Sequence, residues 1–143
     1  MFIKRIVSIV VVAILCSATM GFSNNTEVNW DAFSLNLVKA FKSGHPGLQQ
    51  SAMQHVIKYG DNLDVSEAIY DIALIFRFNE NIQMRRLAMV TLYSIGSDQT
   101  ISYLCAYKKY LDDPSVYNQC CRMISEYAKN KNLKEPLEIT AIH

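Results

Sequence analysis

Apolar residues recur along the middle of this chain at the spacing of one face of an α-helix. From residue 48 they fall at i, i+4, i+8 and i+11, and the same spacing begins again at residues 84 and 116. Positions at this spacing share one face, because an α-helix has about 3.6 residues per turn. The pattern predicts six helices, over residues 30–43, 46–59, 65–78, 81–95, 98–112 and 114–130.

The helical pattern also repeats in the sequence itself. Residues 84–97 match residues 48–61 position by position at an offset of 36, and residues 116–128 follow as a third copy at an offset of 32. A second apolar-periodic segment follows each of the first two copies. A helix pair that recurs at such an interval is typical of an α-solenoid, in which each pair buries its apolar face against the next.

Two kinds of position stand out within the copies. Each copy has a small residue at its second apolar position, where a neighbouring helix could approach closely: Ala52, Ala88 and Cys120. Gly60 and Gly96 close the first two copies. Glycine suits the residue that follows a helix, because it adopts positive φ without the steric cost of a Cβ atom. We therefore expect close helix packing at the first three positions and positive φ at both glycines.

Residues 83–98 read QMRRLAMVTLYSIGSD, and this segment resembles the HEAT-like repeat in its short bacterial form. The resemblance extends over roughly residues 30–130. It implies an all-α fold, a short right-handed α-α superhelix of about three HEAT-like helix pairs, for a domain at residues 23–130. Such repeats occur in unrelated binding proteins and in some enzymes, so the resemblance implies a fold and leaves the function open.

The first 22 residues have a different pattern. Lys4 and Arg5 precede an apolar run of eleven residues that only Ser8 interrupts, and small residues follow. This order predicts a secretory signal peptide over residues 1–22. The run is shorter than the roughly 20 residues that a membrane span needs. We therefore expect export to the periplasm or the extracellular space. The alternative is an uncleaved leader that anchors the protein in a membrane.

Removing this leader changes the composition of the chain. The whole sequence is 50% hydrophobic and carries a net charge of +1. Residues 1–22 hold two of the cations and no acid, so the mature chain has a net charge of −1. Such a balance offers no electrostatic basis for binding nucleic acid, which usually requires a basic domain. Residues 131–143 are predicted to be a C-terminal tail, because Pro136 discourages a helix there.

Residue patterns that carry catalysis or cofactor binding are missing from the sequence. There is no CxxC, GxSxG, phosphate-binding or dinucleotide-binding glycine pattern. His45, His55 and His143 do not lie at metal-ligand spacing from one another or from a cysteine. The sequence therefore predicts no catalytic, metal-binding or cofactor-binding residue, and no enzyme.

Three cysteines remain after the leader: Cys105, Cys120 and Cys121. In an oxidising compartment, Cys105 could form a disulfide with Cys120 or Cys121, because consecutive helices pack antiparallel. The alternative is that all three are small buried side chains, as cysteine often is. We favour burial, because Cys120 occupies the repeat position that Ala52 and Ala88 hold in the other copies.

Tyrosines and arginines form the candidate partner surface. Tyr103, Tyr107 and Tyr110 lie at i, i+4 and i+7, so they form one stripe on a helix. The other candidates are Tyr117, Arg85 and Arg86. Tyrosine is enriched at interface hot spots. The alternatives are that the tyrosines pack between helices, and that the arginines brace neighbouring helices through acidic partners.

The sequence thus predicts an exported protein–protein interaction module or scaffold in the cell envelope, with a partner that it does not identify. The first alternative is a lyase-like or accessory module that binds a small ligand, which would require a pocket near Tyr103, Tyr107 or Cys105. The second is a stabilising subunit of an envelope complex, anchored by the uncleaved leader.

Overall fold

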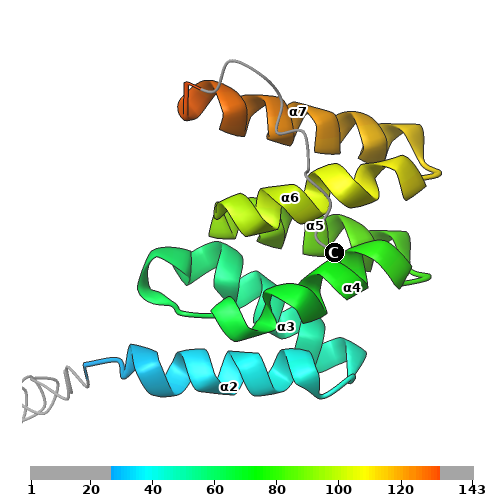
Figure 1. Cartoon of the computed structure of the whole chain (residues 1–143). Coiled ribbons are helices and arrows are strands. Elements are labelled where there is room, and N and C mark those ends of the chain that lie inside the picture. Colours follow the sequence, from blue (N-terminus) through cyan, green and yellow to red (C-terminus); the bar gives the residue numbers. More distant parts are fainter. Residues whose placement is uncertain (1–26, 133–143) are drawn as a thin grey trace, which may run out of the picture.

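The structure is a computed structural model that describes residues 27–132. The predicted signal peptide and residues 133–143 of the predicted tail lie outside the described residues. Within residues 27–132 the fold is all-α, with six α-helices joined by short connections (Figure 1). The helices are α2 (Trp30–Lys42), α3 (Pro46–Tyr59), α4 (Ile69–Phe78), α5 (Ile82–Ile95), α6 (Asp98–Tyr107) and α7 (Pro114–Asn130).

The predicted helices are confirmed, although two of them are shorter α-helices flanked by a turn of 3₁₀-helix. The segment predicted over 65–78 begins with η2 (Ser66–Ala68), and the one predicted over 98–112 ends as η3 (Lys108–Tyr110). A further 3₁₀ turn, η1 (Gly60–Asn62), follows α3. Helix termini often tighten into 3₁₀ geometry to satisfy backbone groups that have no intrahelical partner.

Polar side chains cap the starts of several helices. Ser97 Oγ accepts a hydrogen bond from the backbone of Thr100, whose hydroxyl accepts one from the backbone of Ser97. Asp113 Oδ1 accepts from two backbone N–H groups of α7, and Pro114 occupies the first helical position. These contacts satisfy donors that a helix start leaves unpaired, so local sequence determines where α6 and α7 begin.

The two repeat glycines differ in the structure. Gly96 has φ +62°, and its N–H donates to Leu92 O, as expected for a helix end. The expectation of positive φ at Gly60 is wrong, because its φ is −48°. The chain continues from α3 directly into η1, where Gly60 O accepts from Leu63 N. A right-handed continuation needs no left-handed residue.

The helices stack in two layers. In one layer α3 packs on α5 and α5 on α7, and in the other α2 packs on α4 and α4 on α6. Figure 1 shows the stack rising from α2 at one end to α7 at the other. The three small repeat positions are buried as expected, with Ala52 1%, Ala88 0% and Cys120 0% exposed. No helix within residues 27–132 is both long and apolar enough to span a bilayer.

A short hydrogen bond ties the last helix to α6. The Tyr127 hydroxyl donates to Asp98 Oδ1 over 2.6 Å. This hydrogen bond, followed by burial, raises the pKa of Tyr127 from 10.0 to about 12. The protonated phenol is therefore favoured by folding.

We expect the stability contributed by Tyr127 to be complete below about pH 10 and to be lost as the pH rises through about 12, because the unfolded phenol ionises first. Urea unfolding at a series of alkaline pH values would measure this loss. Tyr127→Phe should flatten that part of the profile, whereas Tyr117→Phe, on an exposed position of the same helix, should leave it unchanged. Identical profiles for all three proteins would contradict the assignment.

Candidate functional site

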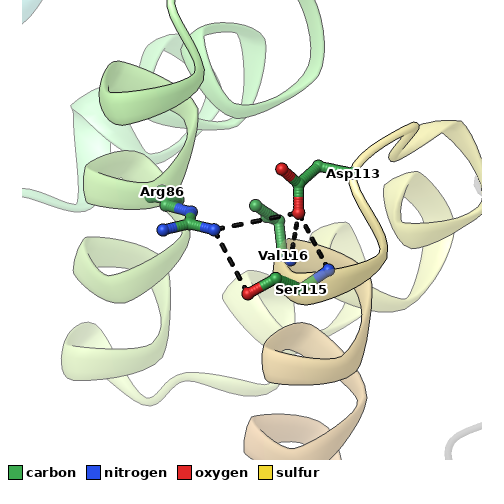
Figure 2. Close-up of polar contacts among 4 residues, drawn as sticks. All are labelled: Arg86, Asp113, Ser115 and Val116. Carbon is green, nitrogen blue, oxygen red and sulfur yellow. Dashed lines mark hydrogen bonds and ion pairs between the residues drawn. The ribbon is translucent and has the colours of Figure 1, made fainter.

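Arg86 braces the start of α7 against α5 (Figure 2). Its Nη2 donates to Ser115 Oγ over 3.2 Å and lies 3.8 Å from Asp113 Oδ1. The same carboxylate oxygen accepts from the backbone N–H groups of Ser115 and Val116. Because the ion pair is partly exposed, its own contribution is below about 1 kcal/mol. Arg86 thus has the bracing role that was the alternative to partner binding.

Arg85 also makes contacts within the protein. Its Nε donates to Phe76 O over 3.2 Å, and its Nη2 donates to Tyr110 O over 3.1 Å. These bonds join α5 to the last turn of α4 and to η3. The acceptors are backbone carbonyls, where sequence reasoning expected acidic side chains. A cation at this place also interacts favourably with the negative end of the α4 dipole.

The predicted tyrosine stripe lies on the face formed by α6 and η3. Tyr103 and Tyr107 are half-buried, with ring centroids 5.8 Å apart, and Tyr110 is 40% exposed. The structure extends the stripe to α4, where Tyr70 is 56% exposed and lies 6.3 Å from the Tyr103 ring. Neighbouring rings at these distances stabilise one another beyond the area that they bury.

Arg77 and Phe78 complete this cluster at the end of α4. The guanidinium carbon of Arg77 lies 3.5 Å from the centroid of the Tyr110 ring and 4.8 Å from that of Phe78. Phe78 is 65% exposed, the largest fraction among the exposed large hydrophobic residues described. These contacts form two groups, and Arg77 and Tyr110 lie near enough to Tyr107 to affect its pKa. We define the aromatic surface as the six residues of the two groups: Tyr70, Tyr103 and Tyr107, and Arg77, Phe78 and Tyr110.

Tyr117 is separate from the aromatic surface. It is 40% exposed and lies on α7, in the other helix layer. Its ring forms no aromatic pair with another ring among residues 27–132. Sequence reasoning missed Tyr70 and Phe78, although the pattern of α4 held a signal. The core face of that helix is defined by other positions, Ile69, Ile72, Ala73 and Phe76, which leaves two aromatic residues off it.

Tyr107 is a neutral phenol at physiological pH, because its pKa is raised from 10.0. Burial raises the pKa of Tyr107, the neighbouring phenols of Tyr103 and Tyr70 raise it further, and the Arg77 cation opposes them. A neutral phenol can donate and accept hydrogen bonds while its ring contributes apolar contact area. The surface therefore offers apolar area, hydroxyl groups and one stacked cation.

Three of the hollows among the described residues lie beside α4, α2 and η1. One of about 340 Å³ runs from Phe78 past Leu74 to Phe41 and Lys42, so it adjoins the aromatic surface. The other two lie beside α2 and beside η1. None of the three is lined by Tyr103, Tyr107 or Cys105. Within residues 27–132 no three His, Cys, Asp or Glu side chains are grouped to hold a metal ion.

The three cysteines of α6 and α7 are free thiols. Cys105 is 9% exposed and Cys120 is fully buried, with its Sγ 3.8 Å from Leu104 O. Burial raises the pKa of Cys105, and it raises the pKa of Cys120 to about 12. Cys121 is only half-buried. The thiolate is the reactive form, so Cys105 and Cys120 should be inert in the folded protein.

We expect iodoacetamide to modify Cys121 first in the native protein, and Cys105 and Cys120 only after unfolding. Peptide mass spectrometry with and without reductant would measure the order in which the three cysteines are alkylated. If Cys121 or Cys105 reacts only after both unfolding and reduction, the protein contains the disulfide that sequence reasoning considered. The intact mass also reports the leader, because Cys16 adds a fourth thiol when residues 1–22 are retained.

Similarity to known proteins does not assign this surface. Comparisons of the chain with models of protein families, with curated proteins and with solved structures find no match. The functional interpretation therefore depends on the geometry of the aromatic surface and on the chemistry of its residues.

Proposed function

We propose that this protein is a binding module that recognises another protein through the aromatic surface. The observation that supports the proposal is the exposure of three rings of this surface. Phe78 and Tyr110, which are 65% and 40% exposed, both contact Arg77, and Tyr70, which is 56% exposed, lies beside Tyr103. Exposed aromatic clusters of this kind are typical of interface centres, where tyrosine and arginine contribute most of the binding energy. The proposal includes no enzymatic activity.

The proposed scaffold for this surface is a short HEAT-like stack. Two observations support it: alternate helices form the two layers, and the small residue of each repeat copy is buried. Stacked helix pairs present one layer as a continuous surface. The aromatic surface lies on α4, α6 and η3, so it spans successive repeats.

The proposed location is the cell envelope or the extracellular space, with residues 1–22 removed as a signal peptide. The order of cationic, apolar and small residues in that segment supports this part of the proposal. N-terminal sequencing of protein recovered from the producing cells would test it. A protein that retains Met1 or Phe2 would favour the membrane-anchored alternative.

Site-specific photo-crosslinking would test the binding function. A photoreactive phenylalanine at position 78 or 70 should yield an adduct of one discrete mass in the producing cells. The same residue at position 48 or 57, which are 50% and 37% exposed on α3, is the matched control. Adding Tyr110→Ala should weaken the adduct, because removing a hot-spot ring costs about 2 kcal/mol or more of binding.

Two results would contradict the proposal. The first is the same set of adducts from α3 and from the aromatic surface, which would indicate random encounters. The second is an adduct at position 78 that is unaffected by Tyr110→Ala and Tyr70→Ala, because a partner that covers this surface must contact both rings. Circular dichroism of each variant would confirm that the helices are intact.

A further inference from the structure

Arg77 stacks on two aromatic rings and has no acidic partner among residues 27–132. Its guanidinium carbon lies 3.5 Å from the centroid of the Tyr110 ring and 4.8 Å from that of Phe78. The ion pairs among residues 27–132 are Lys42–Glu67 and Arg86–Asp113, and neither involves Arg77. Its side chain also makes no hydrogen bond to a described residue. No described residue therefore uses the donors of this arginine.

The acidic residues of α4 and of the flanking connections form no ion pair with Arg77. Asp71 is on the same helix, six residues before Arg77, and this spacing separates the two positions by about 120° around the helix axis. Asp71 and Phe78 both line the 340 Å³ hollow. Glu80 and Asp112 lie in the flanking connections, and neither forms an ion pair with Arg77. Stacking on aromatic rings, in place of an intramolecular ion pair, fixes the plane of the guanidinium.

A second cation, Lys109, contacts the same Tyr110 ring from η3. Lys109 Nζ is 5.0 Å from the centroid of the Tyr110 ring, and Lys108 precedes it. Over residues 27–132 the charges balance, with 11 Lys and Arg against 11 Asp and Glu. A ligand carboxylate at Arg77 would therefore meet this cation without the repulsion of an acidic domain.

We propose that Arg77 binds a carboxylate of the protein partner, and that an apolar side chain next to this carboxylate packs on Phe78 and Tyr110. The inference rests on the proposed binding function and specifies the chemistry of its partner: a segment in which Asp or Glu stands beside a large apolar residue. A guanidinium that is already oriented can form two parallel hydrogen bonds with a carboxylate at a small entropic cost. The exposed rings of Phe78 and Tyr110, once covered by the partner, then exclude water from that pair.

A library of random 12-residue peptides displayed on phage is the probe, selected on the immobilised full-length chain. We expect the selected peptides to be enriched in Asp or Glu beside Leu, Phe or Tyr. One of them would be synthesised in two forms, acidic and with each carboxylate replaced by its amide. Fluorescence anisotropy should show about tenfold weaker binding of the amide form, the loss expected for one charge-assisted hydrogen-bonded pair.

Variants of the protein separate specific contact from general attraction. Arg77→Gln should bind the acidic and amide peptides equally. Arg77→Lys keeps the charge but cannot form bidentate hydrogen bonds with a carboxylate, so it should retain only part of the preference for the acidic peptide. Arg122→Gln removes the same charge from an exposed position on α7 and should retain the full preference. Raising the salt concentration should weaken binding of the acidic peptide more than binding of the amide form.

Each remaining outcome is decisive. Equal binding of the two peptide forms by the unmodified protein would overturn the role of Arg77 and leave the proposed function intact, provided that binding still requires Tyr70 and Phe78. Peptide binding that is insensitive to Tyr70→Ala and Phe78→Ala would contradict the proposed function itself. Failure to select any acidic peptide would overturn the inference. If a single-stranded 12-nucleotide DNA bound more tightly than the acidic peptide and required Arg77, the site would be a nucleic-acid site instead.

Discussion

Replacing Phe76 by alanine should lower the free energy of unfolding by about 3–5 kcal/mol. Phe76 is 0% exposed and lies on α4, which packs on both α5 and α6. The substitution removes the transfer energy of a phenyl ring and leaves a cavity between these helices. Because the total stability of a small domain is roughly 5–15 kcal/mol, this one change should remove a large fraction of it.

Phe78→Ala is the matched control for this experiment. Phe78 lies two residues further along the same helix but is 65% exposed, so the same chemical change should alter the free energy of unfolding by no more than about 0.5 kcal/mol. Urea unfolding followed by circular dichroism would measure both. If Phe76→Ala fails to fold, Phe76→Leu should give a smaller, measurable loss. Equal losses of unfolding free energy at the two positions would show that Phe78 is part of the core, contradicting its assignment to the aromatic surface.

Ala88→Leu should lower the free energy of unfolding by about 1–3 kcal/mol. Ala88 is 0% exposed on α5, the helix that contacts α3, α4 and α6. Three additional carbon atoms at this position cannot be accommodated without moving a neighbouring helix or forcing side chains out of their preferred rotamers. The repeat places a small residue here in every copy, and this packing is its physical reason.

Ala32→Leu is the control for overpacking. Ala32 is an exposed residue of α2, so adding the same three carbon atoms should change stability by less than about 0.5 kcal/mol. Thermal or urea unfolding of the two variants would measure the difference. An unchanged Ala88→Leu protein would mean that α5 and its neighbours have room for a larger side chain, and the packing role of the repeat position would be wrong.

The helices could be predicted from the sequence because their signals are local. Apolar spacing located the six segments, and capping residues such as Asp113 contact backbone groups only a few residues away. Gly60 shows where local reasoning failed. It occupies the same repeat position as Gly96, but its conformation depends on the 3₁₀ turn that follows it, and the repeat contains no information on that turn.

The candidate site was only partly predictable for a different reason. The stripe of Tyr103, Tyr107 and Tyr110 follows from helical spacing on a single segment. The contributions of Tyr70, Arg77 and Phe78 come from α4, more than twenty residues earlier in the chain. Their place beside the stripe depends on how α4 packs on α6, and single-segment periodicity contains no information on that contact.

The sequence by itself determined the all-α class of this protein, the positions of its helices and the residues of its core, because periodicity and capping are properties of neighbouring residues. Only the tertiary structure decided which polar and aromatic side chains are exposed and which are engaged within the described residues. Arg85 and Arg86 are engaged by η3 and α7, whereas Arg77 is stacked on Tyr110 without an acidic partner among residues 27–132. Exposure and pairing of a side chain depend on the segments that fold against it, and those contacts form only when the helices pack.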